Sequence, residues 1–159
     1  MSDDGRGNAD NPGVIAPPPL IYAGTLAAGL LANRRLRLPF LPRRFARTLG
    51  TFLLVSGFLV GLLGFREVRR AGSNVDPREP ATTVVTGGPY RFTRNPMYLG
   101  FVLQYVGISA LFNALPPIVL LPLIQQLMKR GVIEREERYL ERKFGEEYRR
   151  YRESVRRWI

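Results

Sequence analysis

Charged residues are absent from three long windows of the chain and crowded into the segments between them. The uncharged windows cover residues 11–33, 48–65 and 95–128, which are 23, 18 and 34 residues long. A membrane-spanning helix needs about 20 mostly apolar residues, whereas a helix of a soluble domain normally has one charged face. The pattern therefore predicts an all-α integral membrane protein.

The third window is too long for one membrane helix. As a continuous helix it would extend about 51 Å, against a hydrocarbon core of about 30 Å. Asn113, Pro116 and Pro117 lie near its middle and are typical helix breakers. We therefore expect a helical hairpin whose two ends reach the same aqueous surface.

The windows and their flanks predict one membrane domain over residues 14–159, preceded by a disordered leader over residues 1–13. That leader carries three acids and one arginine, unlike the basic start of a signal peptide. Within the domain we expect about four transmembrane helices at residues 15–33, 48–65, 96–112 and 117–130. A polar loop over 72–95, with a short strand at 82–86, and a tail over 131–159 complete the organisation.

The charged tail carries a stripe of apolar side chains. They recur at spacings of 4, 4, 3, 4 and 3 residues, which is typical of an amphipathic helix, and they are Leu140, Phe144, Tyr148, Tyr151, Val155 and Trp158. Gly145 is expected to end one helix and begin the next. The stripe can pack either on the membrane surface or on the neighbouring loop.

The chain is strongly basic, with 24 Lys and Arg against 13 Asp and Glu. The arginines flank the apolar windows, which favours contact with lipid headgroups over nucleic acid. The loop over 66–94 and the tail hold seventeen basic residues, against six in the first loop, so the positive-inside rule places the C terminus in the cytoplasm. The six arginines of the first loop conflict with that topology.

Two absences limit the chemistry. The chain has no cysteine, which excludes disulfides and thiolate catalysis, and no histidine, which excludes an imidazole base. Histidine-ligated metal sites are excluded for the same reason, and we expect no metal. The sequence does not indicate an oligomeric state.

The segment "GPYRFTRNPMYLG", residues 88–100, joins polar, aromatic and turn-forming residues to the start of the hairpin. An interfacial aromatic belt with arginines reaching the headgroups is one interpretation. The acidic cluster at 134–137 can likewise be a solvated helix face, with Glu134 and Arg138 as a pair four residues apart. The hairpin, however, returns the acids to the surface that holds the arginines. A pocket with both charges and aromatic rings suits a zwitterionic ligand with an aromatic ring.

Two segments together carry a family resemblance. "TTVVTGGPYRFTRNPMYLG" followed by "EREERYLERKFGEEYRRYRESVRRW" resembles the integral-membrane methyltransferases related to isoprenylcysteine carboxyl methyltransferase and the phospholipid N-methyltransferases. The resemblance covers residues 72–158. It implies S-adenosylmethionine as cofactor and a lipophilic or lipidated acceptor that enters from the bilayer.

The resemblance also implies roles for matching positions. The cofactor wall would contain Thr82, Thr83, Val84, Val85, Tyr90, Asn95, Pro96, Met97, Tyr98, Glu136 and Glu137. Arg94, Asn95 and Tyr98 are expected to position the reacting groups. Arg91 and Arg130 are candidates for substrate contact. The family's substrate-binding arginine is replaced by Val132 here, and Arg130 or Lys129 is expected to take its place.

Asn95 stands where the family usually has histidine. An amide can donate or accept a hydrogen bond but cannot act as a base near pH 7. Methylation of a carboxylate or thiol, which needs little help from a base, is therefore favoured. N-methylation of a phospholipid amine and a non-catalytic membrane subunit with the same fold are the alternatives.

Overall fold

The computed structural model describes residues 12–159, and every regular element within them is helical. The helices are α1 (Pro18–Leu36), α2 (Arg43–Arg70), the 3₁₀ helix η1 (Gly88–Arg91), α3 (Pro96–Leu111), α4 (Leu115–Met128), the π-helix η2 (Lys129–Ile133), α5 (Glu134–Phe144) and α6 (Glu146–Ser154). The all-α prediction is confirmed for these residues. Most of the leader predicted over 1–13 lies outside the described residues.

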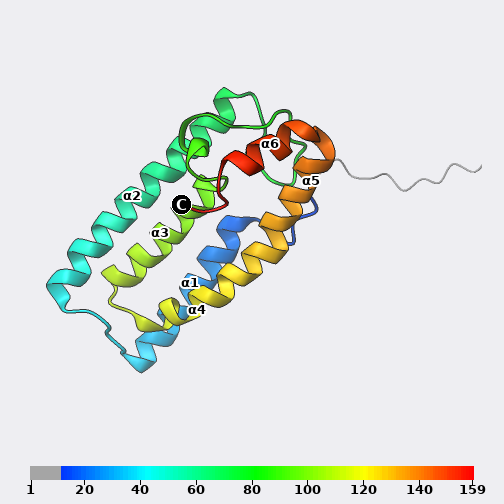
Figure 1. The fold of residues 1–159 in the computed structure, drawn as a ribbon. Coiled ribbons are helices and arrows are strands. Elements are labelled where there is room, and N and C mark those ends of the chain that lie inside the picture. The colour runs from blue at the N-terminus through cyan, green and yellow to red at the C-terminus, as the bar shows by residue number, and fades with distance from the viewer. Residues whose placement is uncertain (1–11) are drawn as a thin grey trace, which may run out of the picture.

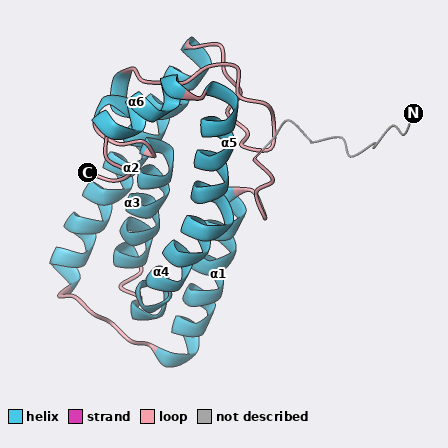
Figure 2. Ribbon diagram, turned by 45° about the vertical axis from the view of Figure 1, so that its right-hand side comes forward, coloured by secondary structure: helices cyan, strands magenta, loops and turns pink. Residues whose placement is uncertain are grey.

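The four long helices α1, α2, α3 and α4 lie side by side (Figures 1 and 2). α5 continues the line of α4, and α6 lies across the same end of the bundle as the loop that follows α2 (Figure 1). The α1–α2 loop and the α3–α4 turn lie at the opposite end. The predicted hairpin is therefore confirmed, and its two ends bring the loop after α2 and the C-terminal segment together.

α2 has the features of a helix in contact with lipid. It has 28 residues, and among the described residues it is the one helix both long and apolar enough to cross a membrane. α3 is also apolar but has 16 residues. Phe52 and Phe58, in the middle of α2, are 66% and 60% exposed. Arginines occupy both of its ends, as expected for side chains that reach headgroups on either side of an apolar layer.

α2 and α3 approach each other through glycine. A Cβ atom added at Gly57 would lie 2.7 Å from the Gly100 carbonyl oxygen, and one added at Gly100 would lie 2.8 Å from the Gly57 carbonyl oxygen. Gly50 and Gly107 make a second contact of the same kind, with the carbonyl oxygen of each 2.9 Å from a Cβ added at the other. Backbone atoms cannot rotate aside as side chains can, so this close packing requires glycine.

The hairpin turn is held by Asn113. Its backbone adopts φ +47°, a left-handed conformation that asparagine tolerates. Its side-chain oxygen accepts hydrogen bonds from the backbone N–H groups of Phe40 and Leu41, and its amide donates to the Leu41 carbonyl. A residue expected only as a helix breaker thus also ties the first loop to the turn.

The return helix runs into the charged tail without a break. α4 passes at Met128 into the π-helical turn η2, and η2 leads directly into α5. A π-helical turn contains an extra residue, so it changes the direction in which the following side chains point. Gly131, Val132 and Ile133 of this turn are buried.

The tail folds as its apolar stripe predicts. Gly145, with φ +54°, separates α5 from α6. Tyr148 and Tyr151 form a buried cluster with Val68, Val84 and Tyr90, against which Leu140, Phe144 and Val155 also pack. Of the two surfaces open to the stripe, it therefore covers the loop after α2.

The prediction of a short strand at 82–86 is wrong, because no strand occurs among residues 12–159. The backbone there is held by side chains instead of a neighbouring strand. The Ala81 N–H donates to the Tyr139 hydroxyl, and the Thr82 N–H donates to Ser73 Oγ.

The glycine contact predicts that Gly57→Ala destabilises the fold by about 1–3 kcal/mol, because the new methyl group forces the α2 and α3 backbones apart. Thermal unfolding of the purified protein in detergent measures the change. Gly24→Ala in α1 is the matched control, because a Cβ there meets nothing within 4 Å. Equal midpoints for the two variants would show that close helix contact does not hold α2 against α3.

Candidate functional site

A pocket opens where the loop after α2, the start of α3, and helices α5 and α6 meet. The empty space beside its lining residues, open solvent included, is about 860 Å³. Ten of the residues proposed from the sequence line it: Thr83, Val84, Val85, Tyr90, Arg94, Asn95, Met97, Tyr98, Glu136 and Glu137. Residues from both halves of the predicted motif thus share one cavity.

Four proposed residues do not line this pocket. The Thr82 hydroxyl donates to the Gly72 carbonyl, and Pro96 is buried in the first turn of α3. Arg91 is exposed on η1. Arg130 is exposed on η2, with its guanidinium 2.9 Å from the side-chain amide of Gln126, and neighbouring Lys129 pairs with Glu134 at 3.9 Å. Glu134 therefore pairs with Lys129, and the predicted pair with Arg138 does not form.

Tyr98 and Glu136 join the hairpin entrance to α5. The Tyr98 hydroxyl donates a hydrogen bond of 2.8 Å to Glu136 Oε2. Tyr98 belongs to the first turn of α3 and is buried, while Glu136 belongs to the first turn of α5 and is half-buried. A carboxylate oxygen accepts several hydrogen bonds, so Glu136 keeps acceptor capacity for a ligand in the pocket.

Burial raises the pKa of Glu136 from 4.5 to about 7, and the neighbouring charge of Glu137 also raises it. The Tyr98 hydrogen bond opposes this rise because it stabilises the ionised carboxylate. A carboxyl with a pKa near neutrality can bind a cation as a carboxylate or hold a proton. Either behaviour is available to Glu136 at physiological pH.

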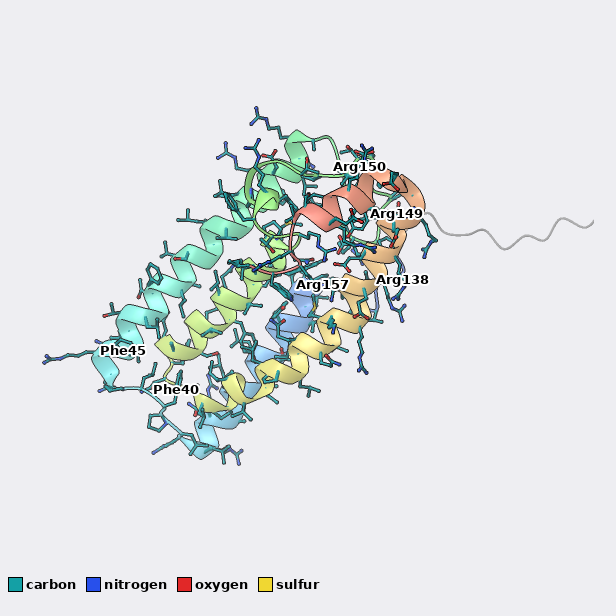
Figure 3. The ribbon with its side chains drawn as sticks, in the orientation of Figure 1. Phe40, Phe45, Arg138, Arg149, Arg150 and Arg157 are labelled. Carbon is teal, nitrogen blue, oxygen red and sulfur yellow. The ribbon has the colours of Figure 1, made fainter. Side chains whose placement is uncertain are left out.

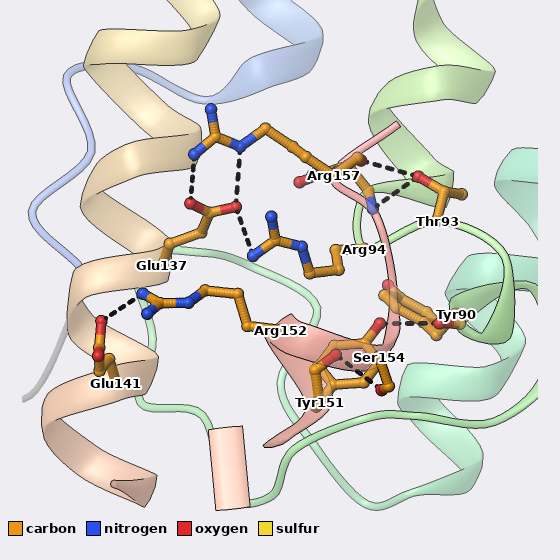
Figure 4. Close-up of polar contacts among 10 residues, drawn as sticks. Tyr90, Thr93, Arg94, Glu137, Glu141, Tyr151, Arg152, Ser154 and Arg157 are labelled. Atoms are coloured by element: carbon orange, nitrogen blue, oxygen red, sulfur yellow. Dashed lines mark hydrogen bonds and ion pairs between the residues drawn. The ribbon is translucent and has the colours of Figure 1, made fainter. Parts of the chain in front are cut away.

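Glu137 is shared by two arginines (Figure 4). Arg157 binds it with two parallel hydrogen bonds, Nε to Oε1 at 3.0 Å and Nη2 to Oε2 at 2.6 Å. Arg94 Nη1 lies 3.2 Å from Glu137 Oε1 on the other side. The Arg94 and Glu137 side chains are 11% and 14% exposed, so this charge cluster is largely shielded from water.

Arg94 is incompletely satisfied. Its Nε and Nη1 atoms are buried without a hydrogen-bond acceptor, since the contact with Glu137 brings the charges together without hydrogen-bond alignment. A buried guanidinium donor without an acceptor carries a free-energy cost. Because Arg94 lines the pocket, a ligand carboxylate is well suited to supply the missing acceptor.

The C-terminal segment is fastened to the residues just before α3. The Arg94 N–H donates to the Arg156 carbonyl, and the Thr93 hydroxyl and Asn95 side-chain amide both donate to the Arg157 carbonyl. Figure 4 shows Thr93 beside the Arg157 backbone. Asn95 is buried, so its amide acts here as a support for the chain end as well as part of the pocket wall.

Aromatic side chains form the apolar part of the wall. The Tyr151 hydroxyl donates to the Tyr90 carbonyl at 2.9 Å, and the Tyr148 and Tyr151 rings meet edge to face. Burial raises the pKa of Tyr148 to about 12 and raises that of Tyr90 and Tyr151 as well, so all three remain neutral. Neutral rings beside Val84 and Met97 suit an aromatic heterocycle.

Sequence reasoning missed several polar residues of the pocket wall: Ser73, Asn74, Asp76, Glu79 and Tyr139. Asp76 is held by Arg78, with Nη2 2.6 Å from Oδ2, and this hydrogen bond lowers the pKa of Asp76 to about 2. The loop residues are not periodic, so no sequence signal placed them. Tyr148 and Tyr151 belonged to the predicted apolar stripe, which was a signal for packing but not for a site.

Comparison with known proteins matches the chain to one protein family. A family model described as phospholipid methyltransferase matches residues 45–147, about two thirds of the chain. An uncharacterized protein of Haemophilus influenzae is 41% identical over 63 residues, which cover 40% of this chain and 79% of that protein. No solved structure gives a significant match. The family match contains the loop, the hairpin and α5, and therefore most of the pocket wall.

The raised pKa of Glu136 predicts a pH-dependent stability. Because the pKa is higher in the folded chain than in the unfolded chain, folding binds a proton between about pH 4.5 and 7, and stability falls as pH rises through this window. Glu136→Gln removes the ionisation and should have a higher unfolding midpoint than the parent at pH 8, with a smaller gain at pH 5.

Thermal unfolding in detergent at both pH values measures this difference. Glu147→Gln on α6 is the control, because Glu147 is exposed and lies outside the pocket wall. A stabilisation by Glu136→Gln that is the same at both pH values would contradict the burial argument.

Proposed function

Because the chain belongs to the phospholipid methyltransferase family, we propose that it transfers a methyl group from S-adenosylmethionine to a lipophilic acceptor at a membrane surface. The observation that carries the proposal is the placement of Glu136, Tyr98 and the incompletely satisfied Arg94 in one pocket at the end of an apolar bundle. A multi-pass arrangement with the C terminus in the cytoplasm is part of the proposal.

The pocket fits the chemical groups of this cofactor. Arg94 has buried donors for the cofactor carboxylate, and Glu136 offers negative charge to its positively charged groups. The rings of Tyr90 and Tyr148, with Val84, suit its adenine. A bound cofactor would supply an electrophilic methyl group on its sulfonium sulfur, and the chain would orient the acceptor and exclude water.

The membrane position follows from α2 and its neighbours. At 1.5 Å per residue α2 is about 42 Å long, enough to cross the apolar layer and enter both interfaces. α4 also exposes apolar side chains, with Val119 and Leu123 67% and 69% exposed. We propose that α1, α2, α3 and α4 all cross the bilayer. The pocket would then lie at its cytoplasmic boundary, within reach of an acceptor held in lipid.

The acceptor chemistry divides into two candidates. A carboxylate or thiol acceptor, as in the isoprenylcysteine carboxyl methyltransferase type, needs little base assistance, and the amide of Asn95 supplies none near pH 7. A phospholipid amine must lose a proton before methylation. Glu136 is a candidate to accept that proton, but the positive charge of a bound cofactor would lower its pKa below about 7 and make it a weaker base.

We expect Glu136→Gln to weaken S-adenosylmethionine binding at pH 8 by about tenfold or more, through loss of a charge-assisted contact. Tyr98→Ala should also abolish tight binding, because it removes the hydrogen bond that orients Glu136. Isothermal titration of the purified protein in detergent measures both. Binding to the parent should tighten from pH 6 to pH 8 as Glu136 ionises, more steeply than binding to Glu136→Gln.

Glu147→Gln again serves as the control and should keep parental affinity. Unchanged affinity in both site variants would show that the cofactor lies elsewhere. No affinity in the parent would favour the non-catalytic subunit. Mass spectrometry of lipids from cells with and without the protein separates the acceptors, since a methylated amine headgroup and a methyl ester or thioether are different products.

A further inference from the structure

We propose that the end of the bundle opposite the cofactor pocket binds the phosphate of an anionic phospholipid. A second pocket lies there, bordered by Arg37, Arg43 and Arg47 together with Asn33, Phe112 and Asn113. This inference concerns a different site from the proposed methyl transfer. It rests on that proposal only for the position of the bundle in a membrane.

Within the described part of the chain, Arg37, Arg43 and Arg47 have no acidic partner. Residues 11–66 contain no Asp or Glu, and none of the ion pairs within residues 12–159 involves an arginine of this loop. The other end of the bundle differs, since Arg94, Arg152 and Arg157 each pair with a glutamate. The three arginines are exposed, and their positive charge is not offset by any acidic side chain among residues 12–159, so it is available to an anion.

The arrangement concentrates this charge. Arg43 and Arg47 are four residues apart on α2, on the side of the helix where Ala46 and Gly50 are buried, and like charges at this spacing repel. Arg37 joins them from the end of α1 with φ +51°, at a position where helices commonly have glycine. A phosphate between the three guanidinium groups would offset the repulsion.

The pocket is built before any ligand binds. Asn113 bonds the backbone of Phe40 and Leu41 to the hairpin turn, and the Leu115 N–H donates to the Leu38 carbonyl. These contacts fix the loop that carries Arg37 relative to α2. A preformed site has less conformational entropy to lose on binding.

Apolar side chains around the pocket favour a lipid over a free anion. Leu36, Phe45 and Phe112 are 58%, 57% and 66% exposed. Figure 3 shows Phe40 and Phe45 at this end of the molecule, far from Arg138, Arg149, Arg150 and Arg157 at the other. A soluble phosphate gains nothing from exposed rings, whereas acyl chains remove them from water.

The position along α2 places these arginines at headgroup level. The uncharged stretch between Arg47 and Arg66 has 18 residues. It therefore spans about 27 Å, close to the thickness of the hydrocarbon core. The cofactor pocket and the arginine pocket then lie in opposite leaflets. The positive-inside rule predicts few basic residues on the side of the membrane where this loop lies. Binding of a lipid phosphate gives the arginines a function on that side, and so accounts for their presence.

The test measures retention of phosphatidylglycerol against phosphatidylcholine by native mass spectrometry of the full chain, released from mixed detergent–lipid micelles. The parent should retain phosphatidylglycerol about tenfold more than phosphatidylcholine, given the strength of arginine–anionic lipid attraction. The triple variant Arg37→Gln, Arg43→Gln, Arg47→Gln should lose this preference. The matched control Arg138→Gln, Arg142→Gln, Arg150→Gln removes equal charge from exposed positions of the other end and should keep it.

Equal retention of the two lipids by the parent, or an unchanged preference in the triple variant, would overturn the proposal. Displacement of the lipid by millimolar inorganic phosphate would do so too, because it would identify a free-phosphate site. If the triple variant does not fold, two measurements of the lipid preference replace it. The single variant Arg37→Gln should have a weaker preference for phosphatidylglycerol than the parent, and the parent should lose its preference in high salt. This experiment contains no S-adenosylmethionine, so its result does not depend on whether the chain transfers methyl groups.

Discussion

The site depends on one shared carboxylate. Glu137 of α5 holds Arg94, which precedes α3, and Arg157, which follows α6. Without this carboxylate, the largely buried Arg94 guanidinium and the partly exposed Arg157 guanidinium would both lose their ion-pair partner, at a free-energy cost. The pairing draws the chain end across the hairpin entrance, where Thr93 and Asn95 then bind the Arg157 carbonyl. The pocket wall is thus assembled from segments far apart in the sequence.

The division between apolar and polar parts of the molecule follows from the same geometry. The hairpin from Pro96 to Met128 has no charged side chain, but its continuation through η2 carries Glu136 and Glu137 beyond the bundle. Tyr98 reaches across from α3 to meet Glu136. The pocket at this junction has polar partners on one side and apolar helices on the other, an arrangement that suits the proposed methylation of a lipid-held acceptor.

The periodic features of the chain could be predicted from the sequence. The hairpin follows from the length of an uncharged window with Asn113 and two prolines in its middle. The break at Gly145 follows from the glycine, which adopts a positive φ that other residues disfavour. The prediction of a strand at 82–86 was wrong because side chains bind the backbone at its start: Ser73 Oγ accepts from Thr82, and the Tyr139 hydroxyl accepts from the preceding Ala81. The unsatisfied donors of Arg94 and the arginine pocket are properties of three-dimensional packing, which no local pattern records.

The contacts of Asn95 change the interpretation of its role. Its amide donates to the Arg157 carbonyl, so it supports the C-terminal segment where the sequence alone suggested a role in positioning the reacting groups. The most direct test of the account is the transfer of radiolabelled methyl from S-adenosylmethionine into a total lipid extract by the purified protein in vesicles. The account predicts labelled lipid with the parent and little with Glu136→Gln. Equal labelling by both proteins would contradict it.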